Sequence, residues 1–170
     1  MKAQLKEVEL EIFRIQGKKH HAVPIEGYSG YFVTTLGKVI SCISRYRGHQ
    51  TQPRGASEPR RLKQRKNSCG YLRVGLVGPD GRVKHELVHR LVAKAYLEEP
   101  DPAPHPREPN FHDLEPRNQV NHIDGNKRNN KVSNLEWTSP KENHEHNKLV
   151  ELVRGLRRKK DHDLLGITKE

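Results

Sequence analysis

The sequence predicts an α+β fold, with a small strand-rich N-terminal module followed by a strand–loop–strand–helix (ββα) unit. The first observation is a glycine-punctuated run of β-branched and aromatic residues from Ile25 to Ser44, which is typical of short strands and tight turns. The second is a hairpin pattern at 71–87, and the third is the ββα pattern at 118–150. We therefore expect an N-terminal extension (1–22), a strand-rich basic module (23–66), a unit ending in the ββα pattern (67–150) and a basic tail (151–170).

The first 22 residues fit two patterns. Leu5, Val8, Ile12 and Ile15 have the spacing of a helical stripe, whereas Val8, Leu10 and Ile12 alternate as in a strand. Both interpretations stay open. Farther along, residues 46–60 are rich in Gly, Pro, Ser and Gln and are predicted to form an exposed basic loop.

The middle of the chain predicts a hairpin and a helix. Residues 71–77 alternate, Gly78–Pro79–Asp80–Gly81 forms a turn, and residues 82–87 return. Apolar residues at helical spacing then predict an amphipathic helix over 88–97. Residues 100–116 contain six prolines and are predicted to be a loop or linker.

The composition indicates a thin core and a polyanionic partner. Only 32% of the 170 residues are hydrophobic, and 32 Lys and Arg outnumber 21 acids, for a net charge of +11. Between Arg45 and Lys66 the chain carries eight cations and one acid, whereas a merely solvated surface normally mixes its signs. Nucleic acid is thus favoured as the partner. The predicted phosphate contacts are Arg45, Arg47, Arg60, Arg61, Lys63, Arg65, Lys66 and Arg73.

The cysteines and the apolar content exclude several classes of protein. Cys42 and Cys69 do not form a Cys-x-x-Cys pair, so neither a thiolate zinc site nor a disulfide framework is expected. No apolar run approaches the roughly 18 residues that span a membrane, and the acidic N-terminus does not read as a signal peptide. We expect an intracellular protein without membrane contact.

The ββα unit is the most informative part of the sequence. Residues 119–123 read as a short strand, 124–133 as a polar loop with a turn, and 135–138 as the returning strand. A helix is predicted to start at Pro140, with Ser139 as its N-cap and Glu142 completing a capping box.

Polar residues on that helix could face the first strand. Asn143, His146 and Asn147 lie along one side, whereas His144 points toward solvent. Amide oxygens suit a hard cation, Mg²⁺ or Mn²⁺, and a nearby histidine can deprotonate water near neutral pH. Such a pair suits phosphodiester hydrolysis. By contrast, His89 and Asp124 are expected to be structural.

This segment resembles a known family. VNHIDGNKRNNKVSNLEWTSPKEN is similar to the HNH (ββα-metal) motif of phage and intron-encoded homing endonucleases. IEGYSGYFVTTLGKVIS resembles the N-terminal module that often precedes such domains. GYLRVGLVGPDGRVKHELVHRLVAKAYL resembles the strands and the helix that lead into them, so the resemblance covers roughly residues 24–147.

The resemblance implies roles for individual residues. His122 matches the general base, and Asn134 matches the central asparagine that pins the loop through hydrogen bonds to backbone. Asn143 matches a metal ligand, and Asn121 takes the other ligand position, where relatives often have Asp or His and this chain offers a neutral oxygen. The further candidate metal ligands are His146 and Asn147.

The resemblance further implies a metal-dependent DNA endonuclease of homing type that leaves 5′-phosphate and 3′-hydroxyl ends. Two alternatives are an HNH nuclease of restriction or phage genome packaging, and a DNA-binding protein with a decayed nuclease site. The expected partner is double-stranded DNA. Because one motif gives one catalytic centre and no segment reads as a dimerisation coiled coil, we expect a monomer that nicks one strand. A phage-encoded chain would act in the cytoplasm of its bacterial host.

Overall fold

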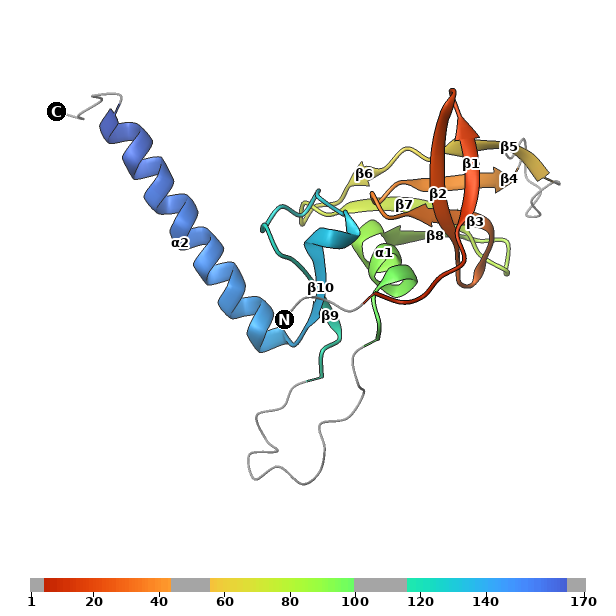
Figure 1. Cartoon of the computed structure of the whole chain (residues 1–170). Coiled ribbons are helices and arrows are strands. Elements are labelled where there is room, and N and C mark those ends of the chain that lie inside the picture. Colours follow the sequence, from red (N-terminus) through yellow and green to blue (C-terminus); the bar gives the residue numbers. More distant parts are fainter. Residues whose placement is uncertain (1–4, 44–55, 100–115, 165–170) are drawn as a thin grey trace, which may run out of the picture.

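The computed structural model describes residues 5–43, 56–99 and 116–164. Strands dominate the N-terminal half, and two α-helices follow in the C-terminal half (Figure 1), which confirms the predicted α+β class. Arg45 and Arg47, most of the predicted basic loop at 46–60 and most of the proline-rich segment at 100–116 lie outside the described residues.

Five antiparallel strands form the first sheet in chain order: β1 (Glu11–Ile15), β2 (Lys18–Ile25), β3 (Tyr28–Thr34), β4 (Val39–Ile43) and β5 (Ala56–Arg61). From Glu11 onward the N-terminal segment is a strand, but the alternation of Val8, Leu10 and Ile12 does not mark its buried face: Val8 and Leu10 precede β1, Ile12 is exposed and Phe13 is buried. Gln16 and Gly17 both have positive φ, as a two-residue hairpin turn of type I′ requires. The boundary expected after residue 22 falls inside β2, because β2 pairs with β1 and β3 at once.

The second sheet and the first helix agree with the sequence prediction. Strands β6 (Arg65–Lys66), β7 (Leu72–Val77) and β8 (Val83–Leu87) are antiparallel neighbours. The turn between β7 and β8 is closed by the Gly78 N–H, which donates to the Arg82 carbonyl at 2.9 Å. Helix α1 (Val88–Tyr96) starts directly after β8 and turns its apolar stripe inward.

The ββα unit is also formed as predicted. Strand β9 (Gln119–His122) pairs antiparallel with β10 (Leu135–Thr138), and a short 3-10 turn, η2 (Val132–Asn134), precedes β10. Helix α2 spans Pro140–Leu164 and projects from the body (Figure 1). The expected tail boundary at residue 150 thus lies inside one continuous helix, because the residues after Pro140 are mostly good helix formers.

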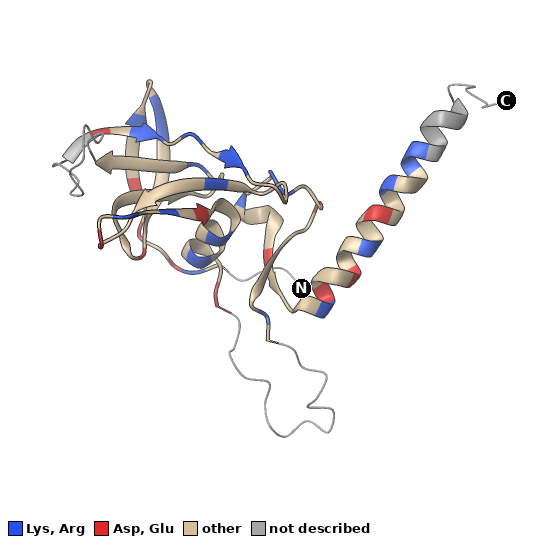
Figure 2. Ribbon diagram, turned by 180° about the vertical axis from the view of Figure 1, so that it is seen from behind, with Lys and Arg blue, Asp and Glu red and all other residues tan. Residues whose placement is uncertain are grey.

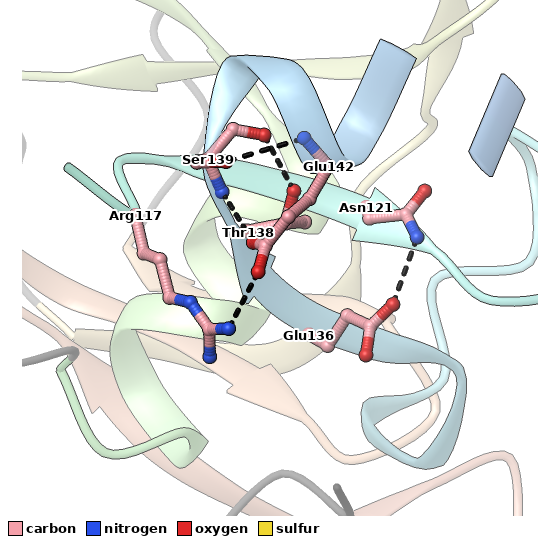
Figure 3. Close-up of polar contacts among 6 residues, drawn as sticks. All are labelled: Arg117, Asn121, Glu136, Thr138, Ser139 and Glu142. Atoms are coloured by element: carbon pink, nitrogen blue, oxygen red, sulfur yellow. Dashed lines mark hydrogen bonds and ion pairs between the residues drawn. The ribbon is translucent and has the colours of Figure 1, made fainter. Parts of the chain in front are cut away.

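The predicted capping box starts α2. The Ser139 N–H donates to Oε2 of Glu142 at 2.9 Å, and the Glu142 N–H donates to Oγ of Ser139 at 3.2 Å (Figure 3). Arg117 donates to the other carboxylate oxygen of Glu142 at 2.6 Å. The Ser139 backbone and the Arg117 guanidinium together hold the pKa of Glu142 below its usual value. Glu142 thus fixes the first turn of α2 to Ser139, which directly follows β10, and to Arg117, which precedes β9.

One hydrophobic core joins the parts that the sequence suggested were separate. It includes Val33 and Val39 of the first sheet, Leu76 of the second sheet, and Val120 and Leu135 of the ββα unit. Helix α1 lies among them and contacts strands of all three sheets. The division into modules stays a prediction, but the described elements pack on a common centre. None of the described helices is long and apolar enough to span a membrane.

Candidate active site

Asn134 organises the loop between β9 and β10. Its Oδ1 accepts a hydrogen bond from the Asp124 N–H at 3.0 Å, and its Nδ2 donates to the Asn129 carbonyl at 2.8 Å. Nδ2 also donates to Oδ1 of Asp124 at 2.9 Å. Because the side chain is buried, these bonds do not compete with water. Asn134 thus makes the backbone contacts that the family pattern implies.

Asp124 acts as a turn residue in this loop, as the sequence suggested. Its carboxylate accepts from the Asn126 N–H at 2.7 Å and from Nδ2 of Asn129 at 2.7 Å. Although partial burial raises the pKa of Asp124, these hydrogen bonds and the one from Asn134 lower it by more. The carboxylate is therefore committed to holding the loop.

His122 ends β9 and is buried, with 4% of its surface exposed. Its Nε2 lies 2.8 Å from Oδ1 of Asn130, and its ring centroid lies 5.1 Å from that of His89. Burial lowers the pKa of His122, although the Asn130 hydrogen bond and the Asp124 charge act in the opposite direction. The imidazole is therefore neutral near pH 7 and can accept a proton.

His89 and Tyr71 form a wall beside His122. The ring centroids of Tyr71 and His89 are 4.8 Å apart, and those of Tyr71 and His122 are 5.9 Å apart. Burial, with the nearby His122 and Arg90, lowers the pKa of His89 to about 3. The sequence indicated a structural role for His89, and the structure adds that this residue packs against His122.

The opposite face of β9 carries oxygen donors. Side chains alternate along a strand, so Gln119 and Asn121 leave β9 on one face and His122 on the other. Asn121 is buried. Its Nδ2 donates at 2.8 Å to Oε1 of Glu136, the residue paired with it on β10 (Figure 3). From α2, Nδ2 of Asn143 donates to Oε1 of Gln119 at 2.6 Å. The predicted ligands Asn121 and Asn143 therefore lie on the same side of β9.

His146 and Asn147 continue this side of α2. Nε2 of His146 lies 3.1 Å from the Ile123 carbonyl, and its buried Nδ1 has no hydrogen-bond partner among the residues that the structure describes. Asn147 is exposed, and its Nδ2 donates to Oδ1 of Asn143 at 3.2 Å. His144 is exposed, as predicted. His146 thus ties α2 to the end of β9, and Asn147 supports Asn143.

These donors fit a hard cation better than zinc. The candidate atoms are the amide oxygens of Asn121 and Asn143 and the carboxylate of Glu136, and such oxygen ligands suit Mg²⁺ or Mn²⁺. Within the described part of the chain, no group of three or more His, Cys, Asp or Glu side chains could hold a metal. Sequence reasoning missed Glu136, because its position opposite Asn121 depends on the strand register.

A basic surface runs along β5 and β6. Arg61, Lys63, Arg65 and Lys66 are exposed along β5 and β6, where Figure 2 shows Lys and Arg gathered. Arg73 pairs with Arg65 across β6 and β7, so both cations share one face. Arg60 differs, because it is half-buried and its Nη2 donates to the Ile43 carbonyl at 3.2 Å.

Sequence reasoning also missed Lys127, which brings a cation close to His122. Its Nζ lies 4.8 Å from the centroid of Tyr71, the ring that packs beside His122, and donates to the Cys69 carbonyl at 3.3 Å. This contact joins the loop of the ββα unit to the segment between β6 and β7.

Comparison with known proteins finds relatives over much of the chain. The HNH endonuclease family model matches residues 110–145. Two uncharacterised HNH endonucleases of Acanthamoeba polyphaga mimivirus are 32% and 30% identical over 126 and 124 residues, which is 74% and 73% of this chain but 29% and 24% of theirs. A Bacillus subtilis protein named as an SPbeta prophage-derived HNH homing endonuclease is 40% identical over 86 residues, 51% of this chain and 42% of its own.

The chain therefore spans less than half the length of these relatives. Among solved structures, one shows DNA binding and cleavage by the HNH homing endonuclease I-HmuI. The I-HmuI chain has 28% sequence identity to this chain. It gives a TM-score of 0.47 over 85% of this chain and 67% of the other.

Proposed function

This chain carries the HNH endonuclease motif that its sequence predicted, and we propose that it is a metal-dependent DNA endonuclease. It hydrolyses phosphodiester bonds and leaves 5′-phosphate and 3′-hydroxyl ends. The observation that carries the proposal is His122, a buried and neutral imidazole with oxygen donors on the neighbouring positions of the same strand. Hydrolysis needs a base for the attacking water, and His122 is the residue proposed for this role.

Asn121 and Asn143 are the proposed ligands of a Mg²⁺ or Mn²⁺ ion. When bound, such an ion neutralises charge on the scissile phosphate and on the departing 3′ oxygen. Glu136 contributes the negative charge that Asn121 lacks, and its hydrogen bond with Nδ2 of Asn121 leaves the amide oxygen of Asn121 free to face a cation. His146, through its unpartnered Nδ1, and Asn147 are the remaining candidates.

The proposed substrate is double-stranded DNA held by the basic surface. Arg61, Lys63, Arg65 and Lys66 supply exposed positive charge, and Arg73 adds to it across the hairpin. Lys127 extends this charge to the ring beside His122. Phosphates bound along this path would place the duplex backbone next to the proposed base.

A homing role is favoured over restriction or packaging, because one relative is named as a prophage-derived homing endonuclease. A phage-encoded protein of this kind would act in the cytoplasm of its bacterial host. A third possibility, a DNA-binding protein with a decayed site, is disfavoured because His122, Asn134 and Asn143 all retain their places in the motif. A plasmid-nicking assay with Mg²⁺ or Mn²⁺ separates the last class from the others.

Replacing His122 by alanine should abolish cleavage while leaving DNA binding within about two-fold of the parent. The general base acts in the chemical step, so its loss should lower kcat by about 10²–10⁴-fold. Plasmid cleavage and a binding titration measure the two effects, and thermal unfolding checks that the buried site remains folded. His144→Ala on the exposed side of α2 is the matched control. Cleavage within a few-fold of the parent would remove His122 from the role of base.

The affinity for the metal should depend on a carboxylate at this cross-strand pair, whether position 121 on β9 or position 136 on β10 carries it. Glu136→Gln should weaken Mn²⁺ binding about ten-fold or more, because a neutral donor replaces a charged one. Asn121→Asp alone should keep or raise the affinity. In the double variant Asn121→Asp/Glu136→Gln, the new Gln can still donate to the new Asp, and affinity should return toward that of the parent.

Calorimetric titration with Mn²⁺ measures these affinities, and cleavage is measured in parallel. Glu145→Gln, an exposed α2 position, is the control. An unchanged Mn²⁺ affinity in Glu136→Gln would show that Glu136 does not contribute to the cation site.

DNA binding should depend strongly on salt, with a slope set by the basic surface. Neutralising Arg61, Lys63, Arg65 and Lys66 to glutamine should lower the slope of log K against log salt by about one for each lost phosphate contact. Fluorescence anisotropy across a salt series measures it. Arg82→Gln/Lys84→Gln on the β7–β8 hairpin serves as a comparison, because β8 is separated from β6 by β7 in the second sheet. An equal slope in parent and quadruple variant would mean that the stretch is only solvated.

A monomer should nick one strand of the duplex. One HNH motif gives one catalytic centre, and a single centre cleaves one phosphodiester in each binding event. Analytical ultracentrifugation with DNA should show a one-to-one complex, and strand-specific end-labelling should show one strand cut faster. A two-to-one complex that cuts both strands at equal rates would contradict this.

A further inference from the structure

Asn130 is the loop residue that touches the proposed base, and its side-chain nitrogen has no partner among the described residues. The residue is buried, with 4% of its surface exposed, and its Oδ1 lies 2.8 Å from Nε2 of His122. Within the part of the chain that the structure describes, its buried Nδ2 has no hydrogen-bond partner. Burying an unpaired amide N–H is unfavourable, so a native structure that keeps one calls for an explanation.

The orientation of this amide decides which nitrogen of His122 is basic. A carbonyl oxygen can only accept a hydrogen bond, so Nε2 of His122 must carry the proton that it shares with Asn130. In the neutral ring the lone pair is then on Nδ1. A ring fixed in this tautomer presents one defined basic atom, whereas a free imidazole exchanges between two.

A turn of the first sheet holds Asn130 in place. Gly37, in the β3–β4 turn, has φ +69°, and a Cβ there would lie 2.5 Å from the Asn130 carbonyl oxygen and 2.7 Å from its Cβ. In the same turn, the Thr35 carbonyl accepts a hydrogen bond from the Val132 N–H at 2.8 Å. Gln64, before β6, donates to the Gly37 carbonyl at 2.7 Å.

From this arrangement we propose that Asn130 is a positioning residue that holds His122 as the Nε2–H tautomer, and that the β3–β4 turn holds Asn130. The catalytic part of the inference rests on the proposed nuclease function, while the tautomer does not. The first sheet then has two roles in the proposed site. It carries part of the basic surface, and it supports the loop that orients the base.

A purely structural role for Asn130 does not explain the contact pattern. The neighbouring loop asparagines satisfy their side chains locally, since Asn126 caps the Arg128 N–H and Asn129 bonds Asp124. Asn130 instead points its oxygen at the ring and leaves its N–H groups unpaired. A buried apolar residue would fill the same space without that cost, but it would leave Nε2 of His122 without an acceptor.

The tautomer is measured directly by ¹⁵N NMR of histidine-labelled protein, without DNA or metal. The His122 signals are assigned by their loss in His122→Gln. We expect the Nε2–H tautomer in the parent and a mixture of tautomers in Asn130→Leu, which keeps the bulk but lacks the oxygen. An Nδ1–H tautomer in the parent would overturn the proposal whether or not the chain cleaves DNA.

Cleavage kinetics test the consequence for the base. Asn130→Leu should lower kcat about 10²-fold while KM stays within about two-fold, as expected for loss of an oriented base. Asn130→Asp restores an acceptor oxygen and should recover kcat to within about ten-fold of the parent, when compared at a pH where the NMR spectra show His122 to be neutral. Equal kcat in the parent and Asn130→Leu, with an unchanged tautomer, would overturn the proposal.

A pair of glycine variants tests the part played by the turn. Gly37→Ala adds a Cβ that must displace Asn130, whereas Gly17→Ala meets nothing within 4 Å at a similar φ of +76°. Both variants carry the same type of backbone strain, so a comparison of the two isolates the displacement. We expect Gly37→Ala to lower kcat at least ten-fold and to broaden or shift the His122 ¹⁵N signals, with Gly17→Ala close to the parent in both. Identical behaviour of the two variants would show that the turn does not position Asn130.

Discussion

The main hydrophobic core, which is packed around α1, is the constraint on which the rest of this structure depends. A smaller cluster of Phe13, Ala22 and Ile40 lies within the first sheet. Only 32% of the residues are hydrophobic, so each predicted module has few apolar residues to bury on its own. The chain solves this by packing both larger sheets and the ββα hairpin around α1, with Val88 and Val92 fully buried at the centre. Elements far apart in sequence are therefore held close to one another, and the site is assembled from several of them.

The two faces of β9 carry different parts of the proposed site. His122 leaves the strand on the side of its core partner Leu135, where burial keeps its imidazole neutral. Asn121 leaves on the other side, toward Glu136 and the helix that carries Asn143. A general base must be unprotonated near the working pH, and burial of His122 favours its neutral form. The oxygen donors of the proposed cation site come from the other face of the strand.

The polar loop between β9 and β10 is stable because its side chains replace water as hydrogen-bonding partners. Asn134 satisfies backbone groups on both sides of the loop, and Asp124 closes the turn. The loop is further held from outside the ββα unit, by Lys127 at the Tyr71 ring and by the β3–β4 turn against Asn130. Such contacts restrict the loop more than its own sequence could, and they place the basic surface next to it.

The sequence by itself determined the elements and the motif. Alternation and turn residues predicted the β7–β8 hairpin, the Ser139–Glu142 capping box predicted the start of α2, and the HNH spacing singled out His122. These features depend on residues a few positions apart, whose patterns are readable locally. The tertiary structure alone decided that Glu136 faces Asn121 and that Gly37 supports Asn130. Strand register and packing around α1 create those contacts, and no local pattern encodes which distant residues will meet.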